Sequence, residues 1–346
     1  MTRRRAFLFS LPLAVAIGAT AIAGPAVAAS ASTPTRGQAA AGWLARQFTG
    51  RSHLVTVFKG VKYPNQGGTI DAIFAFAATG TASDYAARAT SWLETPKVLG
   101  NYIGNGTTSS FAGATAKVAL AAEVRGLNPA DFGGVNLISR LAKLLTKSGR
   151  YSDHSSFGDF SNAFSQALAI LATSRHGKAP ASAVSFLVGT ECKNGGFPLS
   201  FGLKTCVSDT DATGLVVQAL LAAGRPGPVK RGLQWLAKAQ KASGGFAASA
   251  GAAANANSTG LAGEAFAAAK WTARATRARK FLLSLQVGCR GKASELGAIA
   301  FDKTGFAAST ATDATAQGLL GVAGVSLARL SSHGAGNGAP KEVCAS

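Results

Sequence analysis

Two kinds of hydrophobic pattern alternate along the chain, and their alternation predicts pairs of helices. Residues 212–223 are apolar on nearly every side, which is typical of a helix buried on most of its faces. A stretch rich in Gly and Pro ends this segment. Residues 229–240 then place Trp235 and Leu236 on one helical face and lysines on the other. We therefore expect one buried helix and one half-exposed helix in each structural unit.

The same unit recurs six times. An aromatic residue followed by leucine marks the half-exposed helix in five units, and a degenerate pair marks the other. The pairs are Trp43-Leu44, Trp92-Leu93, Leu141-Ala142, Phe186-Leu187, Trp235-Leu236 and Phe281-Leu282, at steps of 45 to 49 residues. Such a period is typical of one supersecondary unit packed against its own copies. Buried helices should form an inner ring and amphipathic helices an outer ring, which predicts an all-α protein with an (α/α)6 toroid over residues 41–328.

The N-terminus has the pattern of an export signal. Arg3, Arg4 and Arg5 precede an apolar stretch, and Ala26-Val27-Ala28 fits a cleavage site, so residues 1–28 are interpreted as a signal peptide. The arginine pair also resembles a twin-arginine signal, but the general secretion route is the default. We expect a secreted protein without a transmembrane segment after cleavage, with a linker over 29–40 and a flexible Gly- and Ser-rich tail over 329–346.

Charge indicates possible partners of the exported chain. The formal net charge of +20 falls to +17 when the three signal arginines are removed. A strongly basic protein attracts polyanions, and outside a bacterium these include anionic cell-wall polymers. A generic solubilising surface is the other interpretation. Nucleic acid is not expected, because the Lys and Arg residues are spread over the helix pairs and form no recognised motif.

Four cysteines in an exported chain predict two disulfides. Cys192 and Cys206 flank one inter-helix loop, so their proximity predicts that they pair. Cys289 and Cys344 then form the second pair by elimination. No two cysteines have the C-x-x-C spacing of a zinc site, so we predict no metal.

Polar residues recur near the start of the predicted inner helices. Alignment of the units gives a first set of polar residues, one in each of four units. A second set lies seven residues after the first, except in the last unit, where the spacing is four residues. The first set is Asp159, Asp211, Asn257 and Asp313, and the second is Gln166, Gln218, Glu264 and Gln317. The first set fits either helix capping or a ligand-binding mouth. The second set predicts a hydrogen-bond network or a polar cavity, because a buried polar group without a partner costs roughly 1–3 kcal/mol.

One unit carries a known repeat motif. Arg231-Gly232-x-x-Trp235-Leu236-x-x-x-Gln240, followed by Gly244-Gly245-Phe246, resembles the QW repeat of the squalene cyclase and prenyltransferase superfamily. Residues 277–286 match its first half, and the resemblance extends over about residues 40–325. It implies the terpenoid cyclase toroid. The glutamine of the motif is expected to bond exposed backbone at a helix end.

The resemblance also implies candidate chemistry. Class II terpene cyclases protonate an alkene with the central acid of an Asp-x-Asp-Asp motif. Asp209-Thr210-Asp211-Ala212 is similar, which makes Asp211 the candidate acid with Asp209 and Asp313 nearby, but Ala212 replaces the last Asp. Such an acid needs its full set of partners. The histidines show no zinc-site arrangement. A glycan-active hydrolase or lyase using two carboxylates is the other enzymatic alternative.

A binding role tolerates the missing catalytic group. The chain is also similar in its repeat, export signal and disulfides to the vitamin B12 carriers of animals, which use an exported toroid. We therefore predict a secreted protein that binds a small molecule or glycan in a polar central cavity without catalysis. The alternatives are an enzyme on the same fold and a structural cell-wall-associated protein. The sequence identifies neither the ligand nor a cofactor.

Overall fold

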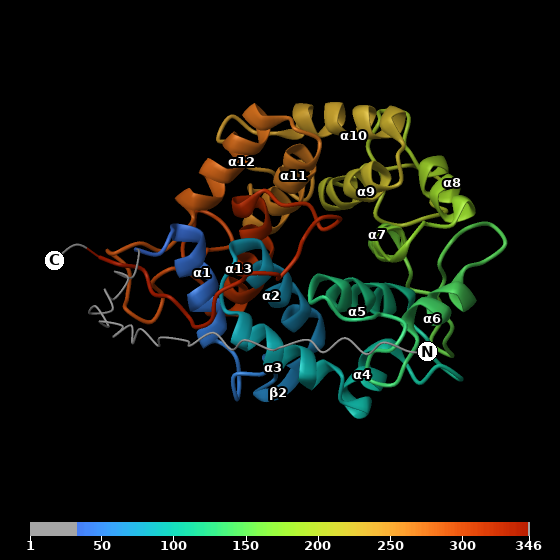
Figure 1. The fold of residues 1–346 in the computed structure, drawn as a ribbon. Coiled ribbons are helices and arrows are strands. Elements are labelled where there is room, and N and C mark those ends of the chain that lie inside the picture. Colours follow the sequence, from blue (N-terminus) through green and yellow to red (C-terminus); the bar gives the residue numbers. More distant parts are fainter. Residues whose placement is uncertain (1–32, 345–346) are drawn as a thin grey trace, which may run out of the picture. The chain divides into compact units, whose positions relative to one another are not determined.

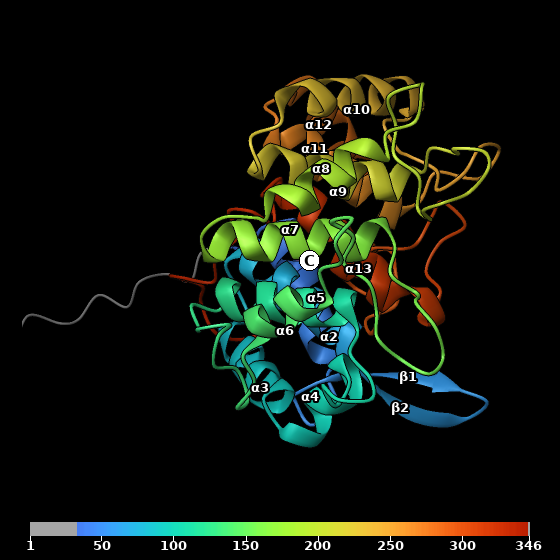
Figure 2. The same ribbon diagram turned by 90° about the vertical axis from the view of Figure 1, so that its right-hand side faces the viewer.

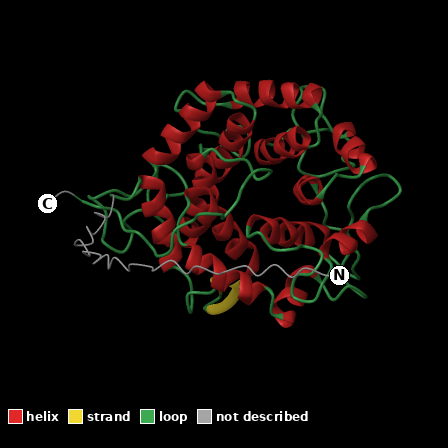
Figure 3. Ribbon diagram, in the orientation of Figure 1, coloured by secondary structure: helices red, strands yellow, loops and turns green. Residues whose placement is uncertain are grey.

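The computed structural model describes residues 33–344, which form thirteen α-helices and one β-hairpin (Figures 1 and 3). The prediction of a mainly helical protein is confirmed. The predicted signal peptide lies outside the described residues. Between residues 33 and 344, no helix is long and apolar enough to cross a membrane.

Six helices contact one another in a closed series, and we call them the inner helices. They are α2 (Gln66–Thr79), α5 (Ala112–Val124), α7 (Ala163–His176), α9 (Thr210–Ala222), α11 (Ala256–Ala268) and α13 (Ala308–Ala323). Each packs against the next, and α13 packs against α2, which closes the ring. Their residues are buried on nearly every side, as the apolar pattern predicts.

The outer helices pack against the outside of this ring (Figure 1). They are α1 (Arg36–Arg46), α3 (Ser83–Leu93), α6 (Leu137–Leu144), α8 (Ala181–Gly189), α10 (Pro226–Ala239) and α12 (Thr272–Ser284). Trp43 belongs to α1, which begins at Arg36, so this helix includes part of the expected linker 29–40. A further short helix, α4 (Pro96–Ile103), lies between α3 and α5.

Neighbouring inner helices run parallel and in register. Asp71 and Lys117 are each the sixth residue of their helices and form an ion pair. Gln218 and Glu264 are each the ninth residue of theirs and share a hydrogen bond. Small residues allow close approach: a Cβ atom on Gly260 would lie 2.4 Å from the Gln317 carbonyl oxygen. All inner helices therefore begin at one end of the ring.

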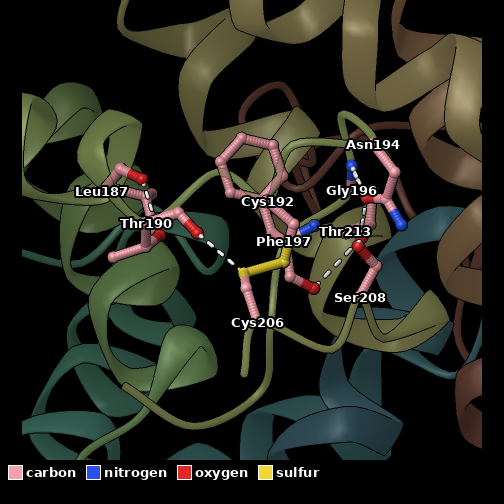
Figure 4. Close-up of a disulfide and its surroundings, with 9 residues drawn as sticks. All are labelled: Leu187, Thr190, Cys192, Asn194, Gly196, Phe197, Cys206, Ser208 and Thr213. Atoms are coloured by element: carbon pink, nitrogen blue, oxygen red, sulfur yellow. Dashed lines mark hydrogen bonds between the residues drawn. A yellow bond between two sulfur atoms is a disulfide. The ribbon is translucent and has the colours of Figure 1, made fainter. Parts of the chain in front are cut away.

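A recurring hydrogen bond attaches each incoming loop to the next inner helix. The backbone N–H of Phe197 donates to Thr213 Oγ1 at 2.9 Å, as Figure 4 shows beside the Cys192–Cys206 disulfide. Four more inner helices repeat the arrangement, with Leu54 to Thr69, Tyr151 to Gln166, Phe246 to Thr259 and Ile299 to Thr315. We call Thr69, Gln166, Thr213, Thr259 and Thr315 the latch residues. All are fully buried.

The glutamines of the resembling motif bond backbone, as expected. Gln240 Nε2 donates to the carbonyl oxygens of Gly244 and Arg274. Gln286 Nε2 donates to those of Arg36 and Gly297. These glutamines therefore join the end of one outer helix to the neighbouring unit, because an unpaired buried carbonyl would be costly.

The sequence pattern did not predict the hairpin. Strand β1 (Leu54–Phe58) pairs antiparallel with β2 (Val61–Asn65), with Leu54 opposite Asn65. The hairpin leads into α2, and most of its side chains are exposed. Alternating β-branched and lysine residues occupy only about ten positions, so they gave no signal beside the helical repeat.

The segment that follows α13, which includes most of the predicted tail 329–346, packs against the helices. After α13 the chain crosses the C-terminal end of the inner ring, shown in red in Figure 1. Gln218 Oε1 accepts from Leu327 N, Arg175 Nη1 donates to Leu327 O, and Ser332 bonds the Val124 carbonyl. Gly336 bonds Gly80. These four bonds tie the glycine-rich segment to four different inner-helix termini or faces.

Both predicted disulfides are present, Cys192–Cys206 and Cys289–Cys344. The second joins the loop before α13 to the end of the C-terminal segment. It closes a loop of 55 residues, so it restricts the unfolded chain more than the first, which closes 14.

Thr213→Val tests the latch. Valine keeps the volume of threonine but leaves the Phe197 amide without an acceptor, so the free energy of unfolding should fall by about 1–3 kcal/mol. Thr90→Val is the control, because Thr90 is also buried but its hydroxyl only donates to Ala86 of its own helix. Denaturant unfolding of both variants measures the difference. Equal losses would show that the latch does not stabilise the fold.

Candidate functional site

A cavity of about 310 Å³ lies at the centre of the inner ring. Its wall is mainly apolar, with Phe74, Phe164, Leu168, Leu215, Leu261, Leu320 and Leu327. Five polar residues interrupt this wall: Asp71, Lys117, Asp211, Glu264 and Gln317. Leu327 belongs to the C-terminal segment, so this segment forms part of the wall at the C-terminal end of the ring. The cavity therefore combines a mainly apolar lining with a few polar groups, which is typical of small-molecule sites.

Asp71 and Lys117 form the charged part of the wall. Lys117 Nζ lies 2.7 Å from Asp71 Oδ1, and both side chains are mostly buried. Burial alone would lower the pKa of Lys117, but the Asp71 carboxylate and Tyr102 outweigh it and raise that pKa above its usual value. The ammonium therefore stays charged, and the pair presents both a donor and an acceptor to the cavity.

Glu264 is the most unusual polar group of the wall. Its side chain is completely buried, and its Oε2 accepts a hydrogen bond from Gln218 Nε2 at 3.1 Å. Burial raises the pKa of Glu264 well above its usual value, and the nearby Asp71 charge adds to this, while the Gln218 bond offsets part of it. The Gln218 amide occupies Oε2, which leaves Oε1 as the other oxygen of this carboxyl. That Oε1 has no hydrogen-bond partner within residues 33–344.

Gln218 connects this acid to the C-terminal segment. Its amide nitrogen donates to Glu264, and its Oε1 accepts from Ser326 Oγ and Leu327 N. The predicted internal network is thus present for Gln218 and Glu264. It also fixes the orientation of the Gln218 amide, because both bonds to Oε1 come from donors.

The first polar set lies at the N-terminal ends of the inner helices. Asp211, Asn257 and Asp313 each stand two residues before a latch residue. Burial raises the pKa of Asp211, and Asp209 adds to this, while the Ser258 hydroxyl lowers it. Asp211 Oδ1 and Asn257 Oδ1 are buried and have no partner in the part of the chain that the structure describes. Burial also raises the pKa of Asp313.

These three residues are not the helix caps. The capping side chains are Asn162, Asp209 and Asn255, which accept from backbone amides at the starts of α7, α9 and α11. The capping interpretation therefore applies to neighbouring residues, two positions earlier in α9 and α11. Asp209 bonds Ala212 N, so its carboxylate is occupied by the helix start.

Two predicted site residues lie elsewhere. Asp159 is in the loop before α7 and pairs with Arg150 at 2.9 Å, while Phe164 takes the position equivalent to Asp211. Gln166 is a latch residue and bonds Tyr151 N, Gly149 O and Ala183 O, so its amide is fully used by the fold. The alignment by residue count was wrong in this unit, because the lengths of the connecting loops differ between units.

Asp71 and Lys117 were not predicted as site residues. Asp71 and Lys117 are each the sixth residue of their helices, and together with Gln317 they line the cavity. The signal was a charged residue in two otherwise apolar helices, which is costly unless the charge is paired. Within residues 33–344, no group of three His, Cys, Asp or Glu side chains is placed to hold a metal ion.

Comparison with known proteins identifies the fold. No protein-family model matches the chain, and no curated protein resembles it significantly in sequence. Among solved structures, the type II terpene cyclase MstE from Scytonema is similar with a TM-score of 0.63 at 13% identity, covering 83% of this chain and 96% of MstE. Protein geranylgeranyltransferase-I of Candida albicans is similar with a TM-score of 0.50 at 12% identity, covering 73% and 83%.

A protein from Actinoplanes is also similar, with a TM-score of 0.61 at 14% identity over 84% of this chain and 98% of that one. A variant of MstE was solved in complex with its substrate, geranylgeranyl dihydroxybenzoate. These identities show a shared fold, that of the terpene cyclase and prenyltransferase toroids. They agree with the resemblance seen in the sequence.

Glu264→Gln tests the buried acid. Because the fold raises this pKa, its contribution to stability is complete below about pH 4.5 and is lost as the pH rises through the raised value. Glutamine is uncharged at every pH, so the melting temperature of the variant should match the wild type near pH 4 and exceed it at pH 8. Scanning calorimetry at several pH values measures the difference. Glu94→Gln, at the end of α3, is the control; a flat difference for Glu264→Gln would contradict the assignment.

Proposed function

We propose that this chain is an exported (α/α)6 toroid that binds one small, mainly apolar molecule in its central cavity. The polar group of that molecule is held by the buried carboxyl of Glu264, and its apolar part contacts the leucine and phenylalanine wall. The proposal places the ligand among the six inner helices, beside the level of Gln218 and Glu264.

The unpartnered Oε1 of Glu264 carries this proposal. A buried polar atom without a hydrogen bond costs about 1–3 kcal/mol, and a ligand with a hydroxyl or carbonyl oxygen would remove that cost. The surrounding wall is apolar, so most of the ligand surface would be buried against carbon atoms. The free-energy cost of this unpartnered polar atom is removed only when a ligand occupies the cavity.

The cavity favours a small molecule over a glycan. About 310 Å³ is at the small end of the range for ligand sites. A sugar would need hydrogen-bond partners around its whole ring, whereas seven leucine and phenylalanine side chains form most of this wall. The substrate of MstE carries a geranylgeranyl chain, which supports an isoprenoid-like ligand for a related toroid.

Proton-transfer catalysis is the second candidate, and Asp211 is the observation that favours it. Its raised pKa and unpartnered Oδ1 give a carboxylic acid beside an apolar cavity. However, Ala212 replaces the last acid of the cyclase motif and Asp209 caps the helix. Only Phe74 and Phe164 present aromatic faces to stabilise a carbocation. A binding role therefore explains more of the residues that line the cavity than a catalytic role does.

Leu261→Trp tests the cavity as a binding site. The indole would fill the space that a ligand needs, so displacement of the fluorescent probe N-phenyl-1-naphthylamine by farnesol should weaken at least tenfold. Leu221→Trp, an exposed position on α9, is the control and should bind as the wild type does. Unchanged binding in Leu261→Trp, or no binding by the wild type, would contradict the proposal.

The same samples separate binding from catalysis. Mass spectrometry of farnesol and geranylgeraniol after long incubation should recover them unchanged with both wild type and Asp211→Asn. A cyclised product formed by the wild type and lost in Asp211→Asn would instead establish the enzyme.

A further inference from the structure

Exposed large hydrophobic side chains gather on the loops that enter the inner helices. The hairpin carries Phe58 and Tyr63, the loop before α7 carries Phe157 and Phe160, and Leu203 and Phe301 lie before α9 and α13. Phe157 is 81% exposed and Phe58 is 61% exposed. Single exposed hydrophobics are common, but a repeated set on one kind of loop marks an interaction surface.

All these loops lie at the same end of the ring. Each connects the end of an outer helix to the start of an inner helix, and the inner helices run parallel. Figure 2 shows the β1–β2 hairpin and the other entering loops projecting from one side of the helices. The C-terminal segment crosses the opposite end. We call the six hydrophobic side chains the apolar rim.

Lysines alternate with the apolar rim. Lys59 and Lys62 flank the hairpin turn, Lys204 follows Leu203, and Lys303 lies two residues after Phe301. All four are exposed. The four segments that connect outer helices to α2, α7, α9 and α13 carry ten Lys and Arg residues and six Asp and Glu residues. Of these acids, Asp159 is paired with Arg150, and Asp302 accepts bonds from Thr304. The rim therefore presents apolar tips within a net positive surface.

We propose that this end of the toroid docks on an anionic lipid surface, with the apolar rim in the interface and the four lysines against the headgroups. Apolar side chains enter the boundary between headgroups and acyl chains, while lysine ammonium groups remain with anionic lipid phosphates. The charge complementarity favours a bilayer over a protein groove, because the apolar tips sit on four separate loops with a lysine on three of them. The inference is independent of the ligand in the cavity.

This docking would place the N-terminal ends of the inner helices toward the membrane. Asp211, Asn257 and Asp313 lie at that end of the ring. No described helix spans a membrane, so attachment would be peripheral.

Vesicle sedimentation tests the docking. The full exported chain should bind vesicles of phosphatidylcholine and phosphatidylglycerol in equal parts, and bind phosphatidylcholine alone weakly. Replacing Lys59, Lys62, Lys204 and Lys303 by Gln should lower partitioning by nearly three orders of magnitude, since each basic side chain near an anionic surface contributes roughly a fivefold change. The matched control replaces Lys143, Lys230, Lys238 and Lys280, which are exposed on outer helices, and should keep most of the binding.

A second variant tests the apolar part. Phe58→Ser/Phe157→Ser/Leu203→Ser should lose about tenfold or more in partitioning, and its helical circular dichroism should match the wild type because these side chains are exposed. Equal losses in the two lysine variants would overturn the proposal in favour of general charge attraction. Unchanged binding in the serine variant would overturn it in favour of a soluble or wall polyanion. A wild-type dimer by sedimentation velocity that the serine variant abolishes, with vesicle binding unaffected, would make the rim a self-association surface.

Discussion

The hydrogen bond between an incoming loop amide and a latch residue is the constraint on which the ring depends. A loop that enters a ring of buried helices brings backbone donors into a region without water, and each buried donor needs an acceptor. The Thr213 hydroxyl provides it for Phe197, and equivalent side chains do so in four other units. In these five units the bonds fix where the loop meets its helix, so they also set the height along the ring axis of the side chains that face the centre.

The polar side chains that face the centre therefore lie at two heights along the ring axis. Asp71 and Gln317 lie two residues after a latch residue, and Lys117 of α5 pairs with Asp71. Gln218 and Glu264 lie five residues after a latch residue and share a hydrogen bond. The remaining units place leucine or phenylalanine at these levels, so the polar groups interrupt an apolar wall. The two ends of the ring differ as well. The C-terminal segment crosses one end, where Gln218 bonds Ser326 and Leu327, and the entering loops surround the other.

The repeat allowed much of this fold to be predicted from the sequence. Trp235-Leu236 and its equivalents marked the outer helices, and the apolar runs marked the inner helices, since burial imposes a strong periodicity. The Cys192–Cys206 disulfide followed from local spacing, Cys289–Cys344 followed by elimination, and the backbone role of Gln240 followed from the resemblance to the repeat motif. Glu264 and Gln218 were found because a polar residue in an apolar helix stands out.

Other features depended on contacts between distant segments. Asp159 and Gln166 were placed wrongly because loop length differs between units, and residue counting cannot detect that. The C-terminal segment was expected to be free because its glycines give no hydrophobic pattern, yet backbone bonds to Val124 and Gly80 hold it. The Asp71–Lys117 pair joins residues from two helices, so only the assembled ring shows that one charge balances the other.

The most direct test of a ligand-filled cavity is native mass spectrometry of the full chain purified from culture medium without denaturation. The account predicts one retained organic molecule per chain, mainly apolar and carrying a hydroxyl or carbonyl group, released on unfolding and identified from its own mass. A chain that appears only at its unliganded mass, and stays so after incubation with farnesol, would contradict it.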